Sequence, residues 1–327
     1  MRSGTLASRA PAAPCSFLGR RLIVHIRGKT FLVTGGSGFI GSHVVDELVA
    51  AEAARVVVFD KAVREANLSD ALESGRVEVI QGDVADLDGL REQMDAVDGV
   101  FHMAVLPLGP CNENPRLGLD VNIVGSFNVF EAAKDAGVSK IVFSSASSVY
   151  GDTFETMDES HPLNARTFYG ATKIASEYLL RGFHEHYGVD YVVLRYMNVY
   201  GPRQDGGLVI NVLRRIQAGE APTIQGDGSQ SFDFVHVADV ARANIRAMES
   251  DVTDDAFNIG GGNEATVREI VERLIDLSGS DLEPDVQADV KVPMMRRVGS
   301  NEKAASLLEW KPSFDLEAGL RDVIGKG

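Results

Sequence analysis

The sequence predicts an α/β protein with a doubly wound parallel sheet and a smaller C-terminal α/β lobe. An apolar strand at residues 31–34 leads directly into a glycine-rich turn and then into apolar positions at helical spacing. Beyond it, strand-like and helix-like runs alternate as far as about residue 145, the order that gives a parallel sheet with helices on both faces. At 327 residues, the chain is long enough for such a sheet and a second lobe.

The expected elements follow one another without a low-complexity linker or an internal repeat. After the first strand, Ile40, Val44 and Leu48 mark the first helix. Further strands are expected at residues 55–59, 77–80, 99–103, 140–144 and 191–195, and helices at 87–94 and 120–135. We assign residues 24–195 to a Rossmann-type domain and 196–327 to a substrate-binding lobe, with residues from about 233 to 260 returning to the first domain. Residues 1–23, rich in Arg, Ala, Ser and Pro, are expected to be a disordered or artefactual extension.

The glycine turn is the candidate binding site for a cofactor. Gly35, Gly38 and Gly41 stand at three-residue spacing between the strand and the helix. Without a Cβ, such a turn lets backbone N–H groups approach a pyrophosphate, and the helix N-terminus adds a partial positive charge. The stretch therefore predicts a dinucleotide site that includes Phe39 and Ile40. The alternative is a tight turn that uses glycine for steric reasons alone.

An acidic residue at the end of the second strand indicates which dinucleotide is bound. Asp60 lies about 20 residues after the glycines, where a carboxylate accepts the ribose hydroxyls of an adenosine and repels a 2′-phosphate. The sequence therefore predicts NAD rather than NADP, although Lys61 and Arg64 moderate that preference. The alternative role of Asp60 is that of a helix cap.

Composition argues against several other classes of protein. The net charge is −15, and residues 1–29 contribute only positive charge, so the body of the chain repels nucleic acid. No apolar run is long enough to span a membrane. Cys15 and Cys111 match neither a disulfide framework nor a metal site, so we expect no metal and a cytoplasmic location.

Eight motifs, in order along the chain, give it a resemblance to a known family. They are Thr34-Gly-Gly-Ser-Gly-Phe-Ile-Gly41, Gly82-Asp-Val84, Val100-Phe-His-Met-Ala104, Asn122-Ile-Val-Gly125, Phe143-Ser-Ser-Ala-Ser-Ser-Val-Tyr-Gly151, Tyr169-Gly-Ala-Thr-Lys173, Arg195-Tyr-Met-Asn-Val-Tyr-Gly-Pro-Arg203 and Gly226-Asp-Gly-Ser-Gln230. Through them, residues 29–324 resemble the extended short-chain dehydrogenase/reductase family, in its branch of NAD-dependent nucleotide-sugar epimerases and dehydratases. The resemblance implies a homodimer, and it implies cofactor contacts at Lys61, Asp83, Val84, Ala104, Asn122 and Ser144.

The resemblance places the chemistry on Tyr169 and Lys173. Four residues apart, the two side chains project from one face of a helix, a spacing that is otherwise typical of a solvated helix surface. A phenol with a pKa of about 10 is a poor base at neutral pH. A cation about 6 Å away, at an effective dielectric near 20, lowers that pKa by about 2 units. Lys173, together with the ring of bound NAD⁺, would thus make Tyr169 a base for a sugar hydroxyl.

One position departs from the family pattern. Ala146 stands where relatives carry the Ser or Thr that donates a hydrogen bond to the sugar oxygen. Losing such a donor costs about 100-fold or more in rate. Ser147 and Ser148 are the candidate replacements. Strand pleating would place Ser148 on the same face as residue 146, whereas an irregular backbone leaves Ser147 as a candidate.

The same positions favour one reaction of the family. Dehydratases carry an Asp and a Glu where this chain has Ser147 and Ser148, and decarboxylases carry a Glu that is also missing. The resemblance therefore implies an NAD-dependent nucleotide-sugar 4-epimerase, similar to the UDP-glucose 4-epimerases. Such an enzyme oxidises the sugar C4 hydroxyl to a transient ketone and returns the hydride to the other face. The alternatives are a dehydratase, decarboxylase or reductase on the same scaffold, or a non-catalytic NAD-binding regulator.

The C-terminal lobe is expected to recognise the substrate, with a UDP-sugar favoured. By resemblance, Asn198 meets the nucleotide diphosphate, but Phe232 replaces the Arg that many relatives use as a diphosphate ligand. Arg203, Arg296 and Arg297 are the candidate substitutes. Ordinary exposed charge is the alternative interpretation of these arginines.

Overall fold

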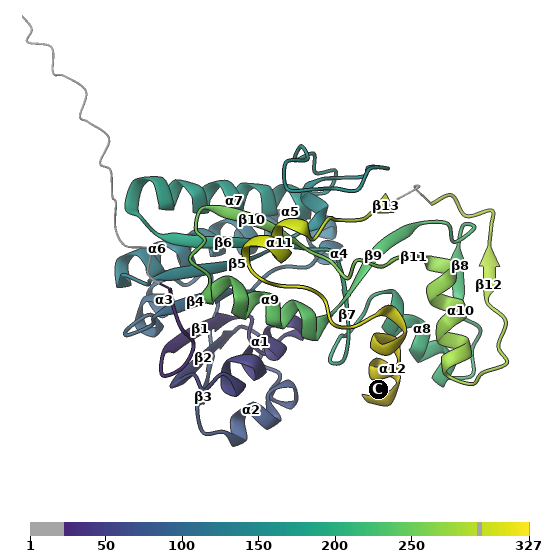
Figure 1. Ribbon diagram of the computed structural model, residues 1–327, viewed down its shortest axis with the longest axis horizontal. Coiled ribbons are helices and arrows are strands. Elements are labelled where there is room, and N and C mark those ends of the chain that lie inside the picture. The colour runs from purple at the N-terminus through teal and green to yellow at the C-terminus, as the bar shows by residue number, and fades with distance from the viewer. Residues whose placement is uncertain (1–22, 293–295, 327) are drawn as a thin grey trace, which may run out of the picture.

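A seven-stranded parallel sheet forms the larger lobe in a computed structural model, which describes residues 23–292 and 296–326 (Figure 1). In spatial order its strands are β10 (Asp255–Ile259), β6 (Asp190–Tyr196), β5 (Lys140–Ala146), β4 (Gly99–His102), β1 (Thr30–Thr34), β2 (Arg55–Asp60) and β3 (Val77–Gln81). The order reverses between β1 and β4, which places a crevice at their carboxyl ends. The predicted fold class, a doubly wound α/β sheet, is confirmed.

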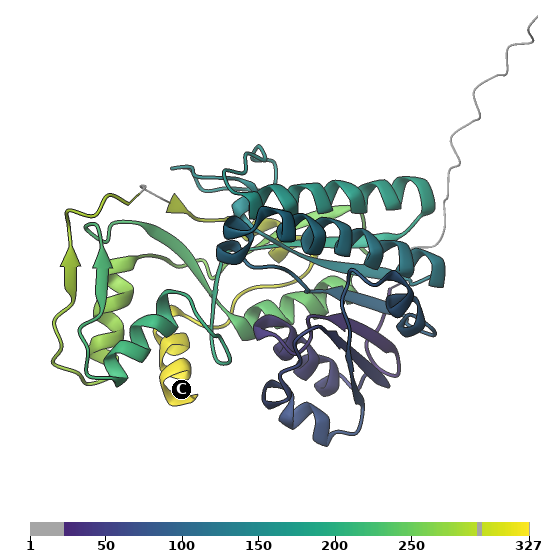
Figure 2. The ribbon, with the colours of Figure 1, turned by 180° about the vertical axis from the view of Figure 1, so that it is seen from behind.

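Helices cover both faces of this sheet and enclose two apolar cores. On one face pack α1 (Phe39–Ala50), α2 (Ser69–Glu73) and α9 (Val237–Glu249), and on the other α3 (Leu87–Gln93), α6 (Ser126–Ala136) and α7 (Phe168–Tyr187). Phe31 and Val33 of β1 point into the first core and Leu32 into the second, and all three are fully buried. This is the pattern of a strand buried on both faces. Seen from behind, α6 and α7 lie side by side (Figure 2).

The smaller lobe has its own sheet and its own core. β9 (Ser231–His236) pairs with β7 (Asn198–Tyr200), β11 (Glu264–Thr266) and β13 (Arg296–Arg297), while β8 (Thr223–Gln225) pairs with β12 (Asp285–Gln287). The helices α8 (Leu208–Gln217), α10 (Val267–Leu277) and α12 (Leu316–Lys326) close a third apolar core. Between these elements the chain returns to the larger lobe, where α9 packs against α1 and β10 pairs with β6 (Figure 1).

The remaining elements are short. They are the helices α4 (Leu108–Glu113), α5 (Pro115–Leu119) and α11 (Glu302–Leu307), the single turns η1 (Glu65–Asn67) and η3 (Ser147–Val149), and η2 (Asp120–Gly125), a wide π-helical turn that leads into α6. Among the described residues, no helix is long and apolar enough to cross a membrane. Residues 1–22, nearly all of the expected N-terminal extension, lie outside the described residues.

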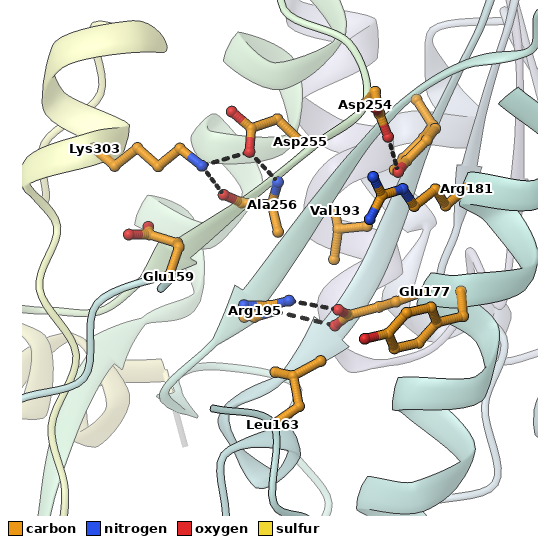
Figure 3. Close-up of a pocket in the computed structure, with 12 residues that line it drawn as sticks. Glu159, Leu163, Glu177, Arg181, Val193, Arg195, Asp254, Asp255, Ala256 and Lys303 are labelled. Atoms are coloured by element: carbon orange, nitrogen blue, oxygen red, sulfur yellow. Dashed lines mark hydrogen bonds and ion pairs between the residues drawn. The ribbon is translucent and has the colours of Figure 1, made fainter. Parts of the chain in front are cut away.

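A buried ion pair joins α7 to the sheet. Arg195 donates from Nη2 and Nε to the two carboxylate oxygens of Glu177, at 2.6 and 3.2 Å, and each side chain is only 8% exposed (Figure 3). Ser145 also donates to Glu177, at 2.5 Å. On the other side, Arg195 donates to the hydroxyl of Tyr150, which donates in turn to Asn258 of β10, each at 2.8 Å. This network links β5, β6, β10 and α7, so it fixes the helix that carries Tyr169.

We predict that Glu177→Gln lowers the free energy of unfolding by about 3 kcal/mol, because it leaves the buried Arg195 guanidinium without a counter-charge. Urea unfolding of both proteins at neutral pH measures the difference. The matched control is Glu317→Gln, which breaks an ion pair with Arg321 in which both side chains are more than half exposed; we expect less than about 0.5 kcal/mol there. Equal effects of the two substitutions would contradict the structural role of the buried pair.

Candidate active site

A cavity of about 830 Å³ opens at the carboxyl ends of the central strands. It lies at the crevice where the strand order reverses, the usual ligand site of a doubly wound sheet. The predicted site residues that line it are Gly35, Gly38, Phe39, Ile40, Gly41, Asp60, Lys61, Asp83, Val84, Ala104, Ser144, Tyr169 and Lys173. The geometry thus brings together the glycine turn, the acidic strand ends and the Tyr–Lys pair.

Two positions of the glycine turn, Gly35 and Gly41, have room only for glycine. Gly35 has a φ of +66°, and a Cβ on it would lie 2.8 Å from the backbone nitrogen of Ala104. A Cβ on Gly41 would lie 2.2 Å from the carbonyl oxygen of Gly35. The N-terminus of α1 follows at Phe39, and no side chain caps it. Its N–H groups therefore face the cavity, where they suit the pyrophosphate of a dinucleotide.

Two carboxylates lie in the cavity beside the glycine turn. Asp60 accepts hydrogen bonds from the backbone and hydroxyl of Ser37, at 3.1 and 2.7 Å, and from the backbone of Ala62 at 3.1 Å. Asp83 pairs with Lys61 at 2.7 Å. Although burial acts to raise it, the Ala85 N–H and the Lys61 ammonium hold the pKa of Asp83 below its usual range. Both carboxylates are thus held at strand ends beside the glycine turn, where the hydroxyls of an adenosine ribose fit.

A buried hydrogen-bond chain leads from Thr34, just before the glycine turn, to Asn122 of η2. Thr34 Oγ1 lies 2.7 Å from His102 Nδ1, and His102 Nε2 lies 2.9 Å from Ser126 Oγ. Because the Ser126 hydroxyl donates to the carbonyl of Asn122 at 2.6 Å, His102 must donate from Nε2 and accept at Nδ1. Burial, reinforced by the charge of Lys173, lowers the pKa of His102 to about 3, so the ring is neutral.

Asn122 has a positioning role in this chain. It is 2% exposed and does not line the cavity. Its side chain accepts from the backbone N–H of Leu106 at 2.7 Å, and it donates to the Leu106 carbonyl at 3.2 Å and to Thr172 of α7 at 3.1 Å. Leu106 does line the cavity. Asn122 therefore holds the segment after β4 against α7. It lies behind Leu106, which lines the cavity, and does not itself line it.

The Tyr–Lys pair lies where the cavity meets α7. Lys173 donates to the carbonyl of Ser144 at 2.6 Å, and its Nζ lies 5.8 Å from the centre of the Tyr169 ring. Burial lowers the pKa of Lys173 to about 7, although the Glu177 carboxylate acts to raise it. Burial also raises the pKa of Tyr169. This direction is opposite to the one predicted from Lys173 alone, because desolvation of the phenolate outweighs the attraction of one cation.

The serines after β5 lie outside the lining of the cavity. Ser147 and Ser148 belong to η3 and are 8% and 5% exposed. Ser148 Oγ has no hydrogen-bond partner among the described residues. Ala146, at the end of β5, is only partly buried. The roles predicted for the two serines remain predictions.

The predicted substrate residues lie in three different places. Asn198 is exposed at the start of β7. Arg296 forms a two-pronged pair with Glu264, at 2.8 and 2.9 Å, and Arg297 lies 3.2 Å from Asp152. Arg203, in contrast, contacts α1 of the larger lobe. The structure therefore brings only Arg296 and Arg297 together, and it pairs both with carboxylates.

Several lining residues were missed in the sequence. They are Met103, Leu106, Ser145, Tyr196, Gln204, Asp205 and Gly206. Tyr196 is 4% exposed, and its hydroxyl lies 3.0 Å from Ser144 Oγ and donates to Asn244 at 3.0 Å. Residues 204–206 follow directly on the motif that ends at Arg203, which is the signal that could have identified them. No cluster of three or more His, Cys, Asp or Glu in the described ranges is arranged to hold a metal ion.

We predict that Lys173→Met stabilises the protein at pH 6 relative to wild type and that this gain shrinks as the pH rises. The pKa of Lys173 is 10.5 in the unfolded chain and about 7 in the folded protein. Between these two values the unfolded state binds one more proton than the folded state, so the unfolding free energy of the wild type rises with pH. Between pH 6 and pH 9.5 we expect the difference in unfolding free energy between variant and wild type to fall by on the order of 3 kcal/mol. Lys311→Met, at an exposed position, is the control; a pH-independent difference for Lys173→Met would contradict the lowered pKa.

Known proteins share both the sequence and the fold. Residues 31–260 match the NAD dependent epimerase/dehydratase family. A putative UDP-glucose 4-epimerase of Methanocaldococcus jannaschii is 35% identical over 308 residues, which cover 90% of this chain and 96% of that protein.

Two solved structures agree. The UDP-N-acetylglucosamine 4-epimerase from Methanobrevibacter ruminantium, in complex with UDP-N-acetylmuramic acid, has a TM-score of 0.86 and 33% identity, covering 92% of this chain and 98% of its own. The dTDP-glucose 4,6-dehydratase from Streptomyces venezuelae with NAD bound has a TM-score of 0.84 and 29% identity, covering 90% and 96%. With its glycine turn, Tyr–Lys pair and two-lobed fold, the chain belongs to the NAD-dependent epimerase/dehydratase family.

Proposed function

We propose that the chain is an NAD-dependent nucleotide-sugar 4-epimerase that acts on a UDP-sugar. The shape of the glycine turn and the uncapped N-terminus of α1 support binding of the dinucleotide. Several epimerases among the similar proteins are named for UDP-sugars, which supports that substrate class. A dehydratase shares the same scaffold, so the choice of reaction depends on the side chains near Tyr169.

One observation carries the choice of epimerisation. The described carboxylates that line the cavity are Asp60, Asp83 and Asp205. Asp60 ends β2 and Asp83 follows β3, both beside the glycine turn, and Asp205 pairs with Arg64. Elimination of water or CO₂ needs an acid or base at the sugar in addition to Tyr169. With no carboxylate of this kind in the described lining, oxidation and re-reduction at C4 is the reaction that the site supports best.

The chain's own groups define the proton transfer. When bound, NAD supplies the acceptor and later the donor of the hydride. Tyr169 takes the proton of the C4 hydroxyl and returns it when the ketone is reduced. Lys173, held by the Ser144 carbonyl, contributes positive charge beside the phenol. Because burial raises the pKa of Tyr169, the positive charge of the oxidised cofactor is needed to favour the phenolate.

The further contacts with substrate are proposals of the same kind. Ser147 and Ser148 remain the candidate donors to the sugar oxygen, because Ser145, which lines the cavity, already donates to Glu177. Asn198, Arg296 and Arg297 remain the candidate ligands of the diphosphate. To bind Arg296, the diphosphate would have to displace the carboxylate of Glu264. Arg296 also holds the pKa of Glu264 below its usual range.

We expect that purified protein with catalytic NAD converts a UDP-sugar into its C4 epimer, a product of unchanged mass, measured by NMR and mass spectrometry on a panel of UDP-, dTDP- and GDP-sugars. Tyr169→Phe should bind NAD within about 2-fold of wild type and turn over at least about 100-fold more slowly. A 4-keto-6-deoxy product or loss of CO₂ would contradict epimerisation. Near-normal turnover of Tyr169→Phe would contradict the base, and NAD binding without any turnover would favour a regulator.

We also propose that the chain is a cytoplasmic homodimer. Apolar side chains on the outer face of α6 and α7 are exposed: Phe127 by 41%, Tyr178 by 62% and Tyr187 by 64%. They line a hollow between these helices, which lie side by side in Figure 2. Exposed aromatic side chains grouped on one pair of helices are typical of an interface between subunits. The cytoplasmic location rests on composition alone.

For the dimer, we expect Phe127→Glu to weaken self-association at least about 100-fold, because it places like charges in a two-fold symmetric apolar contact. Sedimentation velocity over a concentration series measures the effect. Phe154→Glu is the matched control, since Phe154 is 77% exposed on a different face. A monomeric wild type, or an unchanged dimer in Phe127→Glu, would contradict the interface.

A further inference from the structure

Residues 201–207, which we call the strap, connect β7 to α8. Three of them have left-handed or related backbone angles: Gly201 at +153°, Arg203 at +66° and Gly207 at +102°. A Cβ on Gly201 would lie 2.3 Å from Val237 Cγ1, so glycine is required there. A positive φ is unusual for arginine and is a form of backbone strain that other contacts must offset.

The strap forms part of the wall of the cofactor cavity. Gln204, Asp205 and Gly206 line it together with the glycine turn, although they come from a distant part of the chain. Gln204 Nε2 donates to the carbonyl of Val199 at 3.2 Å, while its buried Oε1 has no partner among the described residues. The strap thus carries a buried acceptor that has no partner among the described residues.

Two contacts fasten the strap to α1, the helix whose N-terminus faces the cavity. Arg203 Nη1 donates to Asp46 Oδ2 at 2.7 Å, and the two side chains are 24% and 32% exposed. One residue earlier, the carbonyl of Pro202 accepts from His43 Nε2 at 3.1 Å. The guanidinium of Arg203 is therefore engaged with the larger lobe, away from any place where it would meet a diphosphate on the substrate side.

A third contact crosses the mouth of the cavity at the adenosine end. Asp205 of the strap pairs with Arg64, and both residues line the cavity. Their side chains are at least half exposed, so this pair contributes less than the partly buried pair of Arg203. Together, the three contacts attach a segment of the smaller lobe to both sides of the nucleotide-binding surface.

We infer that the strap retains the bound dinucleotide and that Arg203 is a positioning residue for the strap rather than a substrate ligand. A bound dinucleotide would have the strap over it, so its exchange requires Arg203 and Asp46 to separate. This inference rests on the NAD binding in the proposed function but not on the identity of the sugar. A reaction that regenerates its cofactor in every turnover needs no exchange, so slow release does not limit the rate.

The experiment measures release of the cofactor without turnover. Protein loaded with NADH is mixed with excess NAD, and the loss of bound NADH fluorescence gives the release rate. Arg203→Asn removes the guanidinium and keeps a residue that tolerates a positive φ. We expect release about tenfold faster, the effect of losing one partly buried charged hydrogen bond. Arg321→Gln, which breaks an exposed ion pair on α12, should leave the release rate unchanged.

A charge exchange tests the contact itself. Arg203→Asp alone places two carboxylates together and should release NADH faster still, whereas Arg203→Asp with Asp46→Arg should restore slow release. Wild-type release should also accelerate with added salt, and Arg203→Asn should lose most of that dependence. Equal release rates in wild type and Arg203→Asn, or no rescue by the exchanged pair, would contradict the proposed role of the strap in retaining the dinucleotide. Failure of NADH to bind wild type would overturn the cofactor assignment and the strap with it, whereas NADH binding without epimerisation would leave the strap intact.

Discussion

The hydrogen bond between Thr34 and His102 is the contact on which the geometry of the site depends. It joins the ends of β1 and β4, where the strand order reverses and the cavity opens. His102 passes the connection to Ser126 and so to the carbonyl of Asn122, which also accepts from Ser176 of α7 at 2.8 Å. The glycine turn and the helix of the Tyr–Lys pair are therefore positioned by one buried network, whose direction is set by a neutral imidazole.

Among the described residues, the arginines predicted to meet the substrate are already paired with carboxylates. Arg195 is buried against Glu177, while Arg296, Arg297 and Arg203 each pair with a carboxylate. In a chain with a net charge of −15 this pairing is unsurprising, because carboxylates outnumber cations. It has a consequence for recognition. A phosphate in the smaller lobe must compete with a carboxylate already in place, so affinity for the substrate is a difference between two charge-assisted contacts.

The sequence was sufficient for those parts of the site that depend on backbone geometry. Gly35 and Gly41 stand out in the sequence as a glycine-rich turn between a strand and a helix, and the structure shows that a Cβ would clash at both positions. Tyr169 and Lys173 were identified by the family resemblance, and the helix places them one turn apart, as their spacing predicts. Long-range side-chain contacts were not predictable in this way. Asn122 was expected at the cofactor and lies behind the lining, and Arg203 was expected at the substrate and contacts Asp46, which precedes it by 157 residues.

The pKa of Tyr169 differs in direction from what its spacing to Lys173 predicts. From the i and i+4 positions, one cation near Tyr169 was expected to make it more acidic, but the same packing that brings Lys173 close also removes water from both groups. Burial raises the pKa of Tyr169 and lowers that of Lys173 to about 7, so near neutral pH the lysine carries only part of its charge. The protein alone therefore favours a neutral phenol. A base then forms only where a permanent cation lies beside the ring, and the oxidised nicotinamide is such a cation. Tyr169 can therefore act as a base only while the dinucleotide stays bound. This dependence is a physical reason for a cavity whose wall is attached to both lobes.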